Sequence, residues 1–385
     1  MKFLIIHNRY SRTGGEEGVV ATQQRLLAAH GHEVRLYERS YDEIRGWRMG
    51  KVKSFFTSLR NKRAVRDIER VIADFGPDVA IVHNLYPVIS PVVLPALHKA
   101  GVRVLMTVHN YRLVCPTGLF FTRGEICERC GQSPLREWNC LSRRCEGTLP
   151  GSLAYALRNR RARVRGYYTD NVDRFLALSD FQRDKLTEYG LPGEKFGVIP
   201  NCIDPDSMPA SDAVESDFVG YVGRLSVEKG VDLLFETAGS MPHIKFKVAG
   251  EAAEGVSTEG MPANIELMGL LTREQLADFY RSARVVILPS ICYEGFPLSV
   301  IEAMYYGRTV AVPDIGALGE IVDHGECGML FRAGDRDSFA AAIEALFHDK
   351  GLRDSLGAEG RRRVVSLYNS ERYYTLLMAL SKTGL

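Results

Sequence analysis

An uninterrupted apolar run of about 18 residues, the minimum for a membrane-spanning helix, does not occur in this 385-residue sequence. The first residues, MKFLIIHNRY, contain only a short apolar run and lead into a polar, glycine-rich segment, unlike a signal peptide with its longer apolar core. We therefore expect a cytoplasmic protein, whose contact with a membrane would be peripheral and at its inner face.

A large net charge is also missing. The 49 Lys and Arg residues nearly cancel the 47 Asp and Glu residues, which leaves a formal charge of +2. No global field then attracts nucleic acid or membrane, so an anionic partner would have to be recognised by a local patch. The sequence has no short internal repeat, and its hydrophobic content of 45% is enough for two buried cores.

Short β-rich runs alternate with amphipathic helical stretches along the chain, a pattern that predicts the α/β class with two doubly wound parallel sheets. The expected strands are residues 2–7, 33–38, 78–83, 102–109, 173–179, 217–223, 244–250, 264–269, 284–290 and 309–313. The expected helices are residues 17–30, a stretch ending near Phe75, residues 152–171, and four that start near Lys229, Thr272, Pro297 and Asp335.

The proline-containing segment FGVIPNCIDPDSM indicates a hinge between two domains. We expect a first Rossmann-like domain at residues 1–200, with a Cys-rich insertion at 110–150, and a second at residues 201–369. A C-terminal helix at about 370–385 is expected to pack back on the first domain. Ligands of such sheets bind at the carboxyl ends of strands, here in the cleft between the domains.

The segment EGFPLSVIEA places Glu294 and Glu302 eight residues apart, with an expected helix start at Pro297. Proline suits the first turn of a helix, and the free N–H groups from Phe296 to Ser299 would favour a phosphate. One acid could then face a sugar and the other a ribose. The alternative is a helix start with two acids that have no special role.

Together with this segment, three others resemble family 4 of the retaining glycosyltransferases, and the resemblance covers nearly the whole length. YVGRLSVEKG matches the diphosphate-clamp segment of the family, and NRYSRTGGEEG matches its usual beginning. LALSDFQRDKL followed by FGVIPNCID is similar to the end of its first domain. Cys202 stands where the family usually has glycine.

The resemblance implies a GT-B fold, with an acceptor-side first domain and a nucleotide-sugar-binding second domain. It implies that Glu294 contacts hydroxyls of the transferred sugar, that Glu302 holds the ribose, and that Arg224 and Lys229 neutralise the diphosphate. A fixed pair of cations stabilises the negative charge on the departing phosphate. The other implied donor-binding residues are Gly14, Gly15, Leu270, Gly295, Phe296, Pro297 and Leu298.

Two histidines end neighbouring expected strands. His109 follows residues 102–108, and the corresponding histidine of the family reaches the sugar, so an active-site role is expected. His83 could line the acceptor side. Either residue could instead be structural.

The implied reaction moves a hexose-type sugar from a nucleotide diphosphate, UDP in preference to GDP-mannose, to a glycan or lipid-linked glycan in cell-surface polysaccharide biosynthesis. Such enzymes are usually assigned a front-face mechanism that needs no protein base, although Glu294 could act as a nucleophile. The Asp-x-Asp triplets at 204–206 and 335–337 are interpreted as structural, so catalysis should need no metal or other cofactor. A sugar-nucleotide epimerase and a non-catalytic sugar-nucleotide or zinc-dependent interaction protein are the alternatives.

The insertion contains the pattern C-x2-C-x9-C-x4-C, formed by Cys127, Cys130, Cys140 and Cys145. Two close pairs joined by a loop suit a tetrahedral structural zinc site, with Cys115 as a substitute ligand. The alternative is a set of free thiols. A subset of the family has a similar stretch after its histidine, which would place the insertion beside the acceptor.

Residues 45–66 contain eight Arg or Lys and no acid, interleaved with Trp47, Met49, Val52, Phe55, Phe56 and Leu59. This pattern is typical of an amphipathic helix on an anionic bilayer, and RNRRARVR from Arg158 adds five arginines. A solvated basic face is the alternative. Nucleic acid is not expected, because no nucleic-acid module accompanies these residues.

Overall fold

The computed structural model describes residues 1–10, 14–47, 49–253 and 255–382, without the side chain of Lys51. The chain divides into two compact units. The first contains Met1–Thr122, Cys127–Pro200 and the C-terminal segment from Tyr373, and the second contains Arg123–Ile126 and Asn201–Arg372. No helix in the described parts of the chain is both long enough and apolar enough to cross a bilayer.

The first unit is built on a parallel six-stranded sheet in the order β2-β1-β3-β4-β7-β8. Parallel sheets are covered on both faces, and residues 3–6 of β1 are accordingly fully buried. The sequence order of the strands reverses between β1 and β3. The strands are β1 (Lys2–Arg9), β2 (Glu33–Ser40), β3 (Val79–Val82), β4 (Arg103–Val108), β7 (Arg174–Ala177) and β8 (Phe196–Val198).

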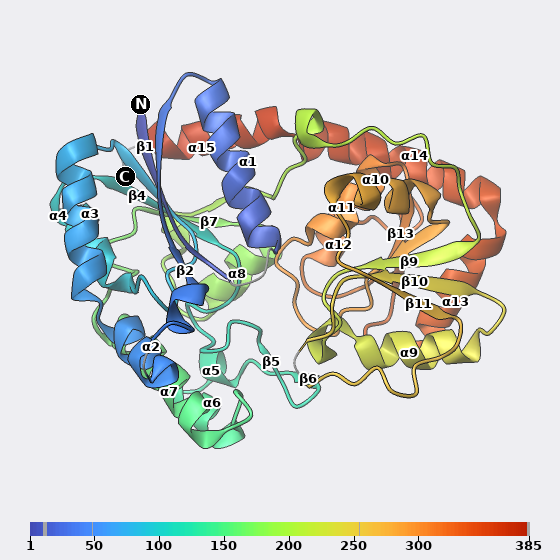
Figure 1. The fold of residues 1–385 in the computed structure, drawn as a ribbon, viewed down its shortest axis with the longest axis horizontal. Helices are drawn as coiled ribbons and strands as arrows, with labels where there is room; N and C mark the ends of the chain where they lie inside the picture. The colour runs from blue at the N-terminus through green and yellow to red at the C-terminus, as the bar shows by residue number, and fades with distance from the viewer. Residues whose placement is uncertain (11–13, 48, 254, 383–385) are drawn as a thin grey trace. The chain divides into compact units, whose positions relative to one another are not determined.

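Helices cover this sheet, and α15 runs alongside it at the end of the chain (Figure 1). The expected helix ending near Phe75 is two helices, because Asn61 caps the second by accepting from the N–H groups of Arg63 and Ala64 at 3.0 and 3.1 Å. The expected helix 152–171 is α7, which begins and ends earlier. The bounds are α1 (Gly15–Ala29), α2 (Gly50–Leu59), α3 (Lys62–Phe75), α4 (Leu94–Lys99), α5 (Arg129–Gln132), α6 (Trp138–Arg143), α7 (Leu149–Val164), α8 (Asp180–Glu188) and α15 (Ser370–Lys382), with the short strand β5 (Phe121–Thr122). The short strand β6 (Glu125–Ile126) lies in the segment Arg123–Ile126, which is grouped with the second unit.

The second unit has its own parallel sheet, in the order β11-β10-β9-β12-β13-β14. The strand order reverses between β9 and β12. The strands are β9 (Phe218–Val222), β10 (Lys245–Ala249), β11 (Ile265–Gly269), β12 (Val285–Ile287), β13 (Thr309–Pro313) and β14 (Met329–Phe331). The helices are α9 (Val231–Ser240), α10 (Arg273–Ser282), α11 (Leu298–Tyr305), α12 (Leu318–Ile321), α13 (Arg336–His348) and α14 (Lys350–Leu367).

The two sheets confirm the predicted α/β class with two doubly wound, Rossmann-like layers. The predicted helix starts of this unit lie within two residues of the observed ones. Thr272 caps α10, and Asp335 caps α13 by accepting from the Ser338 N–H at 2.8 Å, which confirms the helix-start interpretation of the second Asp-x-Asp triplet. Pro297 takes the cap position of α11 and not its first turn.

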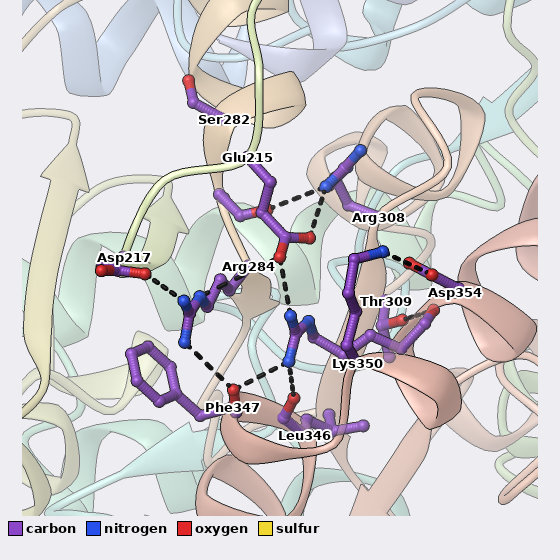
Figure 2. A network of polar contacts seen from close by, with 12 residues as sticks. Glu215, Asp217, Ser282, Arg284, Arg308, Thr309, Leu346, Phe347, Lys350 and Asp354 are labelled. Atoms are coloured by element: carbon purple, nitrogen blue, oxygen red, sulfur yellow. Dashed lines mark hydrogen bonds and ion pairs between the residues drawn. The ribbon is translucent and has the colours of Figure 1, made fainter.

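A polar network ties the second unit together at the amino ends of its strands (Figure 2). Glu215 accepts from Arg308 at 3.0 Å and from the buried Arg353 at 2.7 Å. Arg353 also donates to the backbone oxygens of Leu346 and Phe347, at 2.9 and 2.8 Å, and so satisfies carbonyl groups in the last turn of α13. Ligands of open parallel sheets bind at the opposite edge, so this network serves stability.

Candidate active site

The carboxyl edge of the second sheet brings two loops together where the strand order reverses. One loop follows β9 and the other follows β12, and the N–H of Ile291 donates to the backbone oxygen of Glu228 at 3.1 Å. Gly230 makes the approach possible: its φ is +75°, and a Cβ there would lie 1.9 Å from the Pro289 oxygen. Ligands of such sheets bind at this reversal.

Lys229 and Glu294 form an ion pair at this point. The Lys229 ammonium donates to both Glu294 carboxylate oxygens at 2.7 and 2.8 Å, and the Ser290 hydroxyl donates to one of them. Glu294 is only 7% exposed. Burial is the largest single effect and would lower the pKa of Lys229, but Glu294, Cys292 and Glu228 together outweigh it. The net shift of the pKa is upward, so the lysine is a cation at neutral pH.

Arg224 holds a different carboxylate on the same loop. Its guanidinium lies 2.5 Å from Glu228, and the Tyr221 hydroxyl donates to the Arg224 backbone oxygen at 2.7 Å. Although burial acts to raise the pKa of Glu228, hydrogen bonds and Arg224 lower it overall. The Arg224 side chain is 57% exposed, so it can reach a ligand at the edge of the sheet.

The segment after Glu294 leads into α11. Phe296 is buried with its ring edge-on to Tyr368, at 5.0 Å between centroids, and its backbone oxygen accepts from Asn201 at 2.9 Å. These contacts fix Gly295 and Pro297 on either side of it. No side chain caps α11, so the N–H groups that begin with Leu298 are not blocked by a cap.

Glu302 lies on the second turn of α11. One of its oxygens accepts from the Tyr280 hydroxyl at 2.9 Å, and the other has no hydrogen-bond partner within the described residues. Burial raises the pKa of this carboxyl. Leu270, directly after β11, has a 68% exposed side chain.

The first unit has a cavity beyond the ends of β3 and β4. His109 lines it, as predicted for the carboxyl end of a strand, together with His83, whose side chain is only 1% exposed. His83 Nδ1 lies 2.8 Å from His109 Nε2. Burial lowers the pKa of both histidines, so both are neutral at pH 7.

Gly14 and Gly15 are at the start of α1. Gly14 is the cap residue, and its N–H donates at 2.9 Å to Glu17, which also accepts from the Tyr10 N–H at 3.0 Å. Residues 11–13 of the predicted glycine-rich segment lie outside the described residues. The two glycines therefore shape the beginning of the helix.

Sequence reasoning missed two charged residues of the cavity, Glu16 and Arg112. Arg112 donates to Asn84 at 3.3 Å, but its Nε is buried without a partner among the described residues, as is one oxygen of Glu16. The position of Arg112, three residues after His109, was the available signal. Both side chains keep hydrogen-bonding capacity for a polar ligand.

Residues 13–207 match the family model described as Glycosyltransferase Family 4, and residues 207–363 match the one described as Glycosyl transferases group 1. The chain belongs to glycosyltransferase family 4. Over 279 residues it is 25% identical to an "Uncharacterized 42.6 kDa protein in cps region" of Klebsiella pneumoniae, with 71% of this chain and 67% of the relative covered. It spans from 48% to 61% of the length of four other relatives.

Solved structures show the same fold for this glycosyltransferase. Sucrose-phosphate synthase from Thermosynechococcus elongatus superposes with a TM-score of 0.73 at 20% identity, covering 98% of both chains. Anabaena HepE in complex with UDP and glucose superposes with a TM-score of 0.68 at 16% identity, covering 100% of both chains. The architecture of this glycosyltransferase is thus GT-B.

The cysteines of the glycosyltransferase form no disulfide in the structure. Cys130 and Cys140 are buried, and Cys127 and Cys145 are half-buried. Among the described residues, the one group of three or more potential ligands with all atoms within 4.8 Å is His243, Glu344 and His348. The four cysteines would have to draw closer to hold zinc, and their zinc site stays a prediction.

The basic stretches of the glycosyltransferase differ in what they contact. Arg158 is buried, with its guanidinium 4.2 Å from the centre of the Tyr86 ring; Arg161 donates to the Leu59 oxygen, and Arg163 pairs with Glu137. Much of the RNRRARVR run therefore supports the fold and is not a free cationic surface.

The first basic stretch is more open. Met49, Val52 and Phe56 of the α2 region are 69%, 47% and 60% exposed. A neighbouring groove has cations without an ion-pair partner in the described part of the chain. Its lining consists of Arg60, Lys62, Val65, Arg66, Val92, Pro95 and Tyr167.

Proposed function

We propose that this glycosyltransferase is a retaining, metal-independent enzyme that moves a hexose-type sugar from a UDP-sugar to a glycan or lipid-linked glycan. The observation that carries the proposal is the Lys229–Glu294 pair at the reversal of the second sheet. A cation and a carboxylate side by side match the two parts of the donor, because the diphosphate needs positive charge and the sugar hydroxyls need an acceptor.

The charges fit the bond that breaks. Cleavage of the bond between sugar and diphosphate leaves negative charge on the phosphate, which Lys229 and Arg224 would stabilise together with the N–H groups at the start of α11. The raised pKa of Lys229 keeps its charge available across the neutral range. No metal is needed for this role in the proposal.

Glu294 is a poor candidate for a covalent nucleophile. Three hydrogen bonds, two from Lys229 and one from Ser290, occupy its carboxylate and lower its nucleophilicity. We therefore favour the front-face route, in which the leaving phosphate takes the proton of the acceptor hydroxyl. Glu294 would then hold the sugar, and Glu302 would offer its unoccupied oxygen to the ribose.

UDP is preferred over GDP because the HepE structure of the same fold is a complex with UDP and glucose. The Klebsiella relative, named for its place in a cps region, is the reason for proposing a role in cell-surface polysaccharide biosynthesis. Direct binding of the nucleotides tests UDP against GDP.

A thermal-shift screen of UDP, GDP and their sugars, with EDTA present throughout, tests the donor. A ligand at one hundred times its dissociation constant adds about 2.7 kcal/mol of stability, so the preferred donor should give the largest upward shift. Transfer of radiolabelled sugar to an acceptor extract, with analysis of the anomeric configuration, tests the reaction. An inverted product, or activity that returns only when magnesium replaces EDTA, would contradict the proposal.

The same assays separate the alternatives. An epimerase would convert the UDP-sugar into its epimer without an acceptor, whereas a non-catalytic binding protein would be stabilised by the donor and leave it intact. The contact between a cation and an acid, Lys229 and Glu294, favours the transferase over both.

Peripheral contact with an anionic membrane is the second part of the proposal. The exposed apolar residues of α2 could insert among lipid headgroups, and the cations Arg60, Lys62 and Arg66 could meet the phosphates. Among the described residues that line their groove there is no carboxylate.

A further inference from the structure

A buried chain of hydrogen bonds runs from α15 to His109 within the first unit. The Gln23 amide donates to the Tyr373 hydroxyl at 2.8 Å, and the Gln23 oxygen lies 3.0 Å from His83 Nε2. His83 Nδ1 then lies 2.8 Å from His109 Nε2. Gln23 and His83 are both 1% exposed and Tyr373 is 5% exposed, so water cannot replace these partners.

The donor and acceptor directions of these hydrogen bonds determine which ring nitrogen of each histidine carries a hydrogen. Because the amide nitrogen of Gln23 faces Tyr373, its oxygen faces His83, and His83 Nε2 must carry a hydrogen. A neutral His83 then has a bare Nδ1, which can only accept. His109 must donate to it from Nε2, and its own Nδ1 is left without a hydrogen.

Charged neighbours do not change this assignment. The ring of His7 lies edge-on to His83 at 6.0 Å between centroids. Burial, followed by His109 and His7, lowers the pKa of His83 and so disfavours a second proton on its ring. Glu16 and Glu17 act on His109 in the opposite sense, but burial is the larger effect and keeps its pKa below the ordinary value. Both rings are therefore neutral at pH 7.

We propose that Gln23, His83 and Tyr373 are positioning residues that hold His109 as the Nε2–H tautomer, so that its Nδ1 accepts a hydrogen bond from a sugar hydroxyl. Nδ1 of His109 has no hydrogen-bond partner in the described part of the chain, and the residue lines the cavity of the first unit. The assignment of the hydroxyl rests on the proposed transferase function. The assignment of the tautomer does not depend on that function.

Nitrogen NMR of protein labelled at histidine tests the tautomer directly in the ligand-free state. The chain has nine histidines, and the His83→Gln and His109→Gln variants assign the two signals. We expect long-range proton–nitrogen correlations to show His109 with hydrogen on Nε2 and a bare Nδ1. Hydrogen on Nδ1 of His109, or on both nitrogens at pH 7, would overturn the proposal.

Gln23→Met keeps the size of the side chain but removes the acceptor. We expect the His109 signals to shift toward an average of the two tautomers and kcat/KM to fall about tenfold, because a misdirected imidazole no longer accepts from the substrate. Tyr373→Phe frees the Gln23 amide and should act in the same direction if Gln23→Met folds poorly. Tyr374→Phe is the matched control, since this neighbour on α15 bonds His32 at 2.9 Å and not Gln23.

The two proposals fail separately. Unchanged His109 signals in folded Gln23→Met and Tyr373→Phe would refute the positioning role, whatever the enzyme transfers. A normal tautomer pattern in a protein that transfers no sugar would leave the hydrogen-bond chain intact and refute the transferase.

Discussion

The ammonium group of Lys229 donates to both carboxylate oxygens of Glu294, at 2.7 and 2.8 Å, and so joins the loop after β9 to the loop after β12. The pair is satisfied before any donor arrives. A diphosphate would compete with Glu294 for the lysine, and sugar hydroxyls would compete with the lysine for Glu294. Each residue thus keeps the other aimed at the place where the donor is proposed to bind.

Removing either partner should affect turnover strongly. We expect Glu294→Gln or Lys229→Ala to lower kcat by roughly two to three orders of magnitude, as is typical for the loss of one electrostatic contact to a transition state. Steady-state transfer from the preferred donor measures the effect. Glu236→Gln, an exposed acid on α9, is the control and should retain normal turnover. Near-normal rates in both site variants would refute the assignment.

Donor affinity should depend on pH through Glu302. Burial raises the pKa of its carboxyl above the ordinary 4.5, so acidification protonates it earlier than an exposed acid. An ionised carboxylate accepts ribose hydroxyls better, so affinity should fall as the pH is lowered toward this raised pKa. Calorimetry at several pH values measures the affinity for a UDP-sugar, whose diphosphate does not titrate near neutral pH.

Two variants sharpen the pH experiment. Glu302→Gln should remove the pH dependence and weaken binding about tenfold or more, as expected for a hydrogen bond to a charged group. Tyr280→Phe removes a hydrogen bond that lowers the pKa of Glu302, so the loss of affinity should begin at higher pH than in the wild type. The same pH profile in all three proteins would show that Glu302 is not the titrating group.

Charge reversal at Lys51, Lys53, Arg60 and Lys62 together should reduce binding to anionic liposomes and leave donor hydrolysis intact. High salt should weaken the wild-type interaction for the same electrostatic reason. Reversal of four exposed cations elsewhere, Lys99, Lys245, Arg361 and Arg372, gives the same change in net charge as a control. Equal liposome binding by both quadruple variants would favour a solvated basic face.

The pattern of the sequence predicted the two sheets because parallel strands are buried on both faces and appear as apolar runs. This pattern did not predict two short strands at the edges of the sheets. β8 lies within FGVIPNCID, where the prolines suggested a hinge, and β14 has only three residues. The break between α2 and α3 depends on Asn61, whose capping role is visible only when its partners are known.

Part of the candidate site was predictable because some of its residues follow recognisable strands. Lys229 and Glu294 belong to motifs that mark the ends of strands, and the structure brings them into contact. Arg112 and Gln23 belong to no motif, and their roles come from burial and from partners 28 and 60 residues away in the chain. Sequence periodicity carries no information about such pairings.

The network of Figure 2 predicts a large stability effect far from the candidate site. Glu215→Ala would leave Arg353, whose side chain is 5% exposed, without its carboxylate and should lower the free energy of unfolding by about 3 to 5 kcal/mol. Asp217→Ala is the matched control. Asp217 pairs with Arg284 and is 75% exposed, and an exposed ion pair contributes only about 0 to 1 kcal/mol. Urea unfolding measures both, and equal effects would contradict the argument.

The last prediction concerns zinc, of which we expect about one ion per chain, bound by Cys127, Cys130, Cys140 and Cys145. The insertion supplies thiols from α5, α6 and the segments beside them, and two of the four are buried where an ion would be shielded from water. Their sulfurs do not form a closed group in the structure, so binding should contract the insertion.

Because metal binding of this kind contributes folding free energy, Cys130→Ser should loosen the insertion, as measured by proteolysis between residues 110 and 150. Donor binding should persist, since the proposed donor contacts lie mostly in the second unit. Cys292→Ser, a buried cysteine outside the insertion, is the control. Elemental analysis of protein purified without added metal decides the point. Less than about a tenth of an equivalent of zinc, with the half-buried Cys127 and Cys145 reactive in the native protein, would make free cysteines the better account, since zinc-bound thiolates are held as ligands.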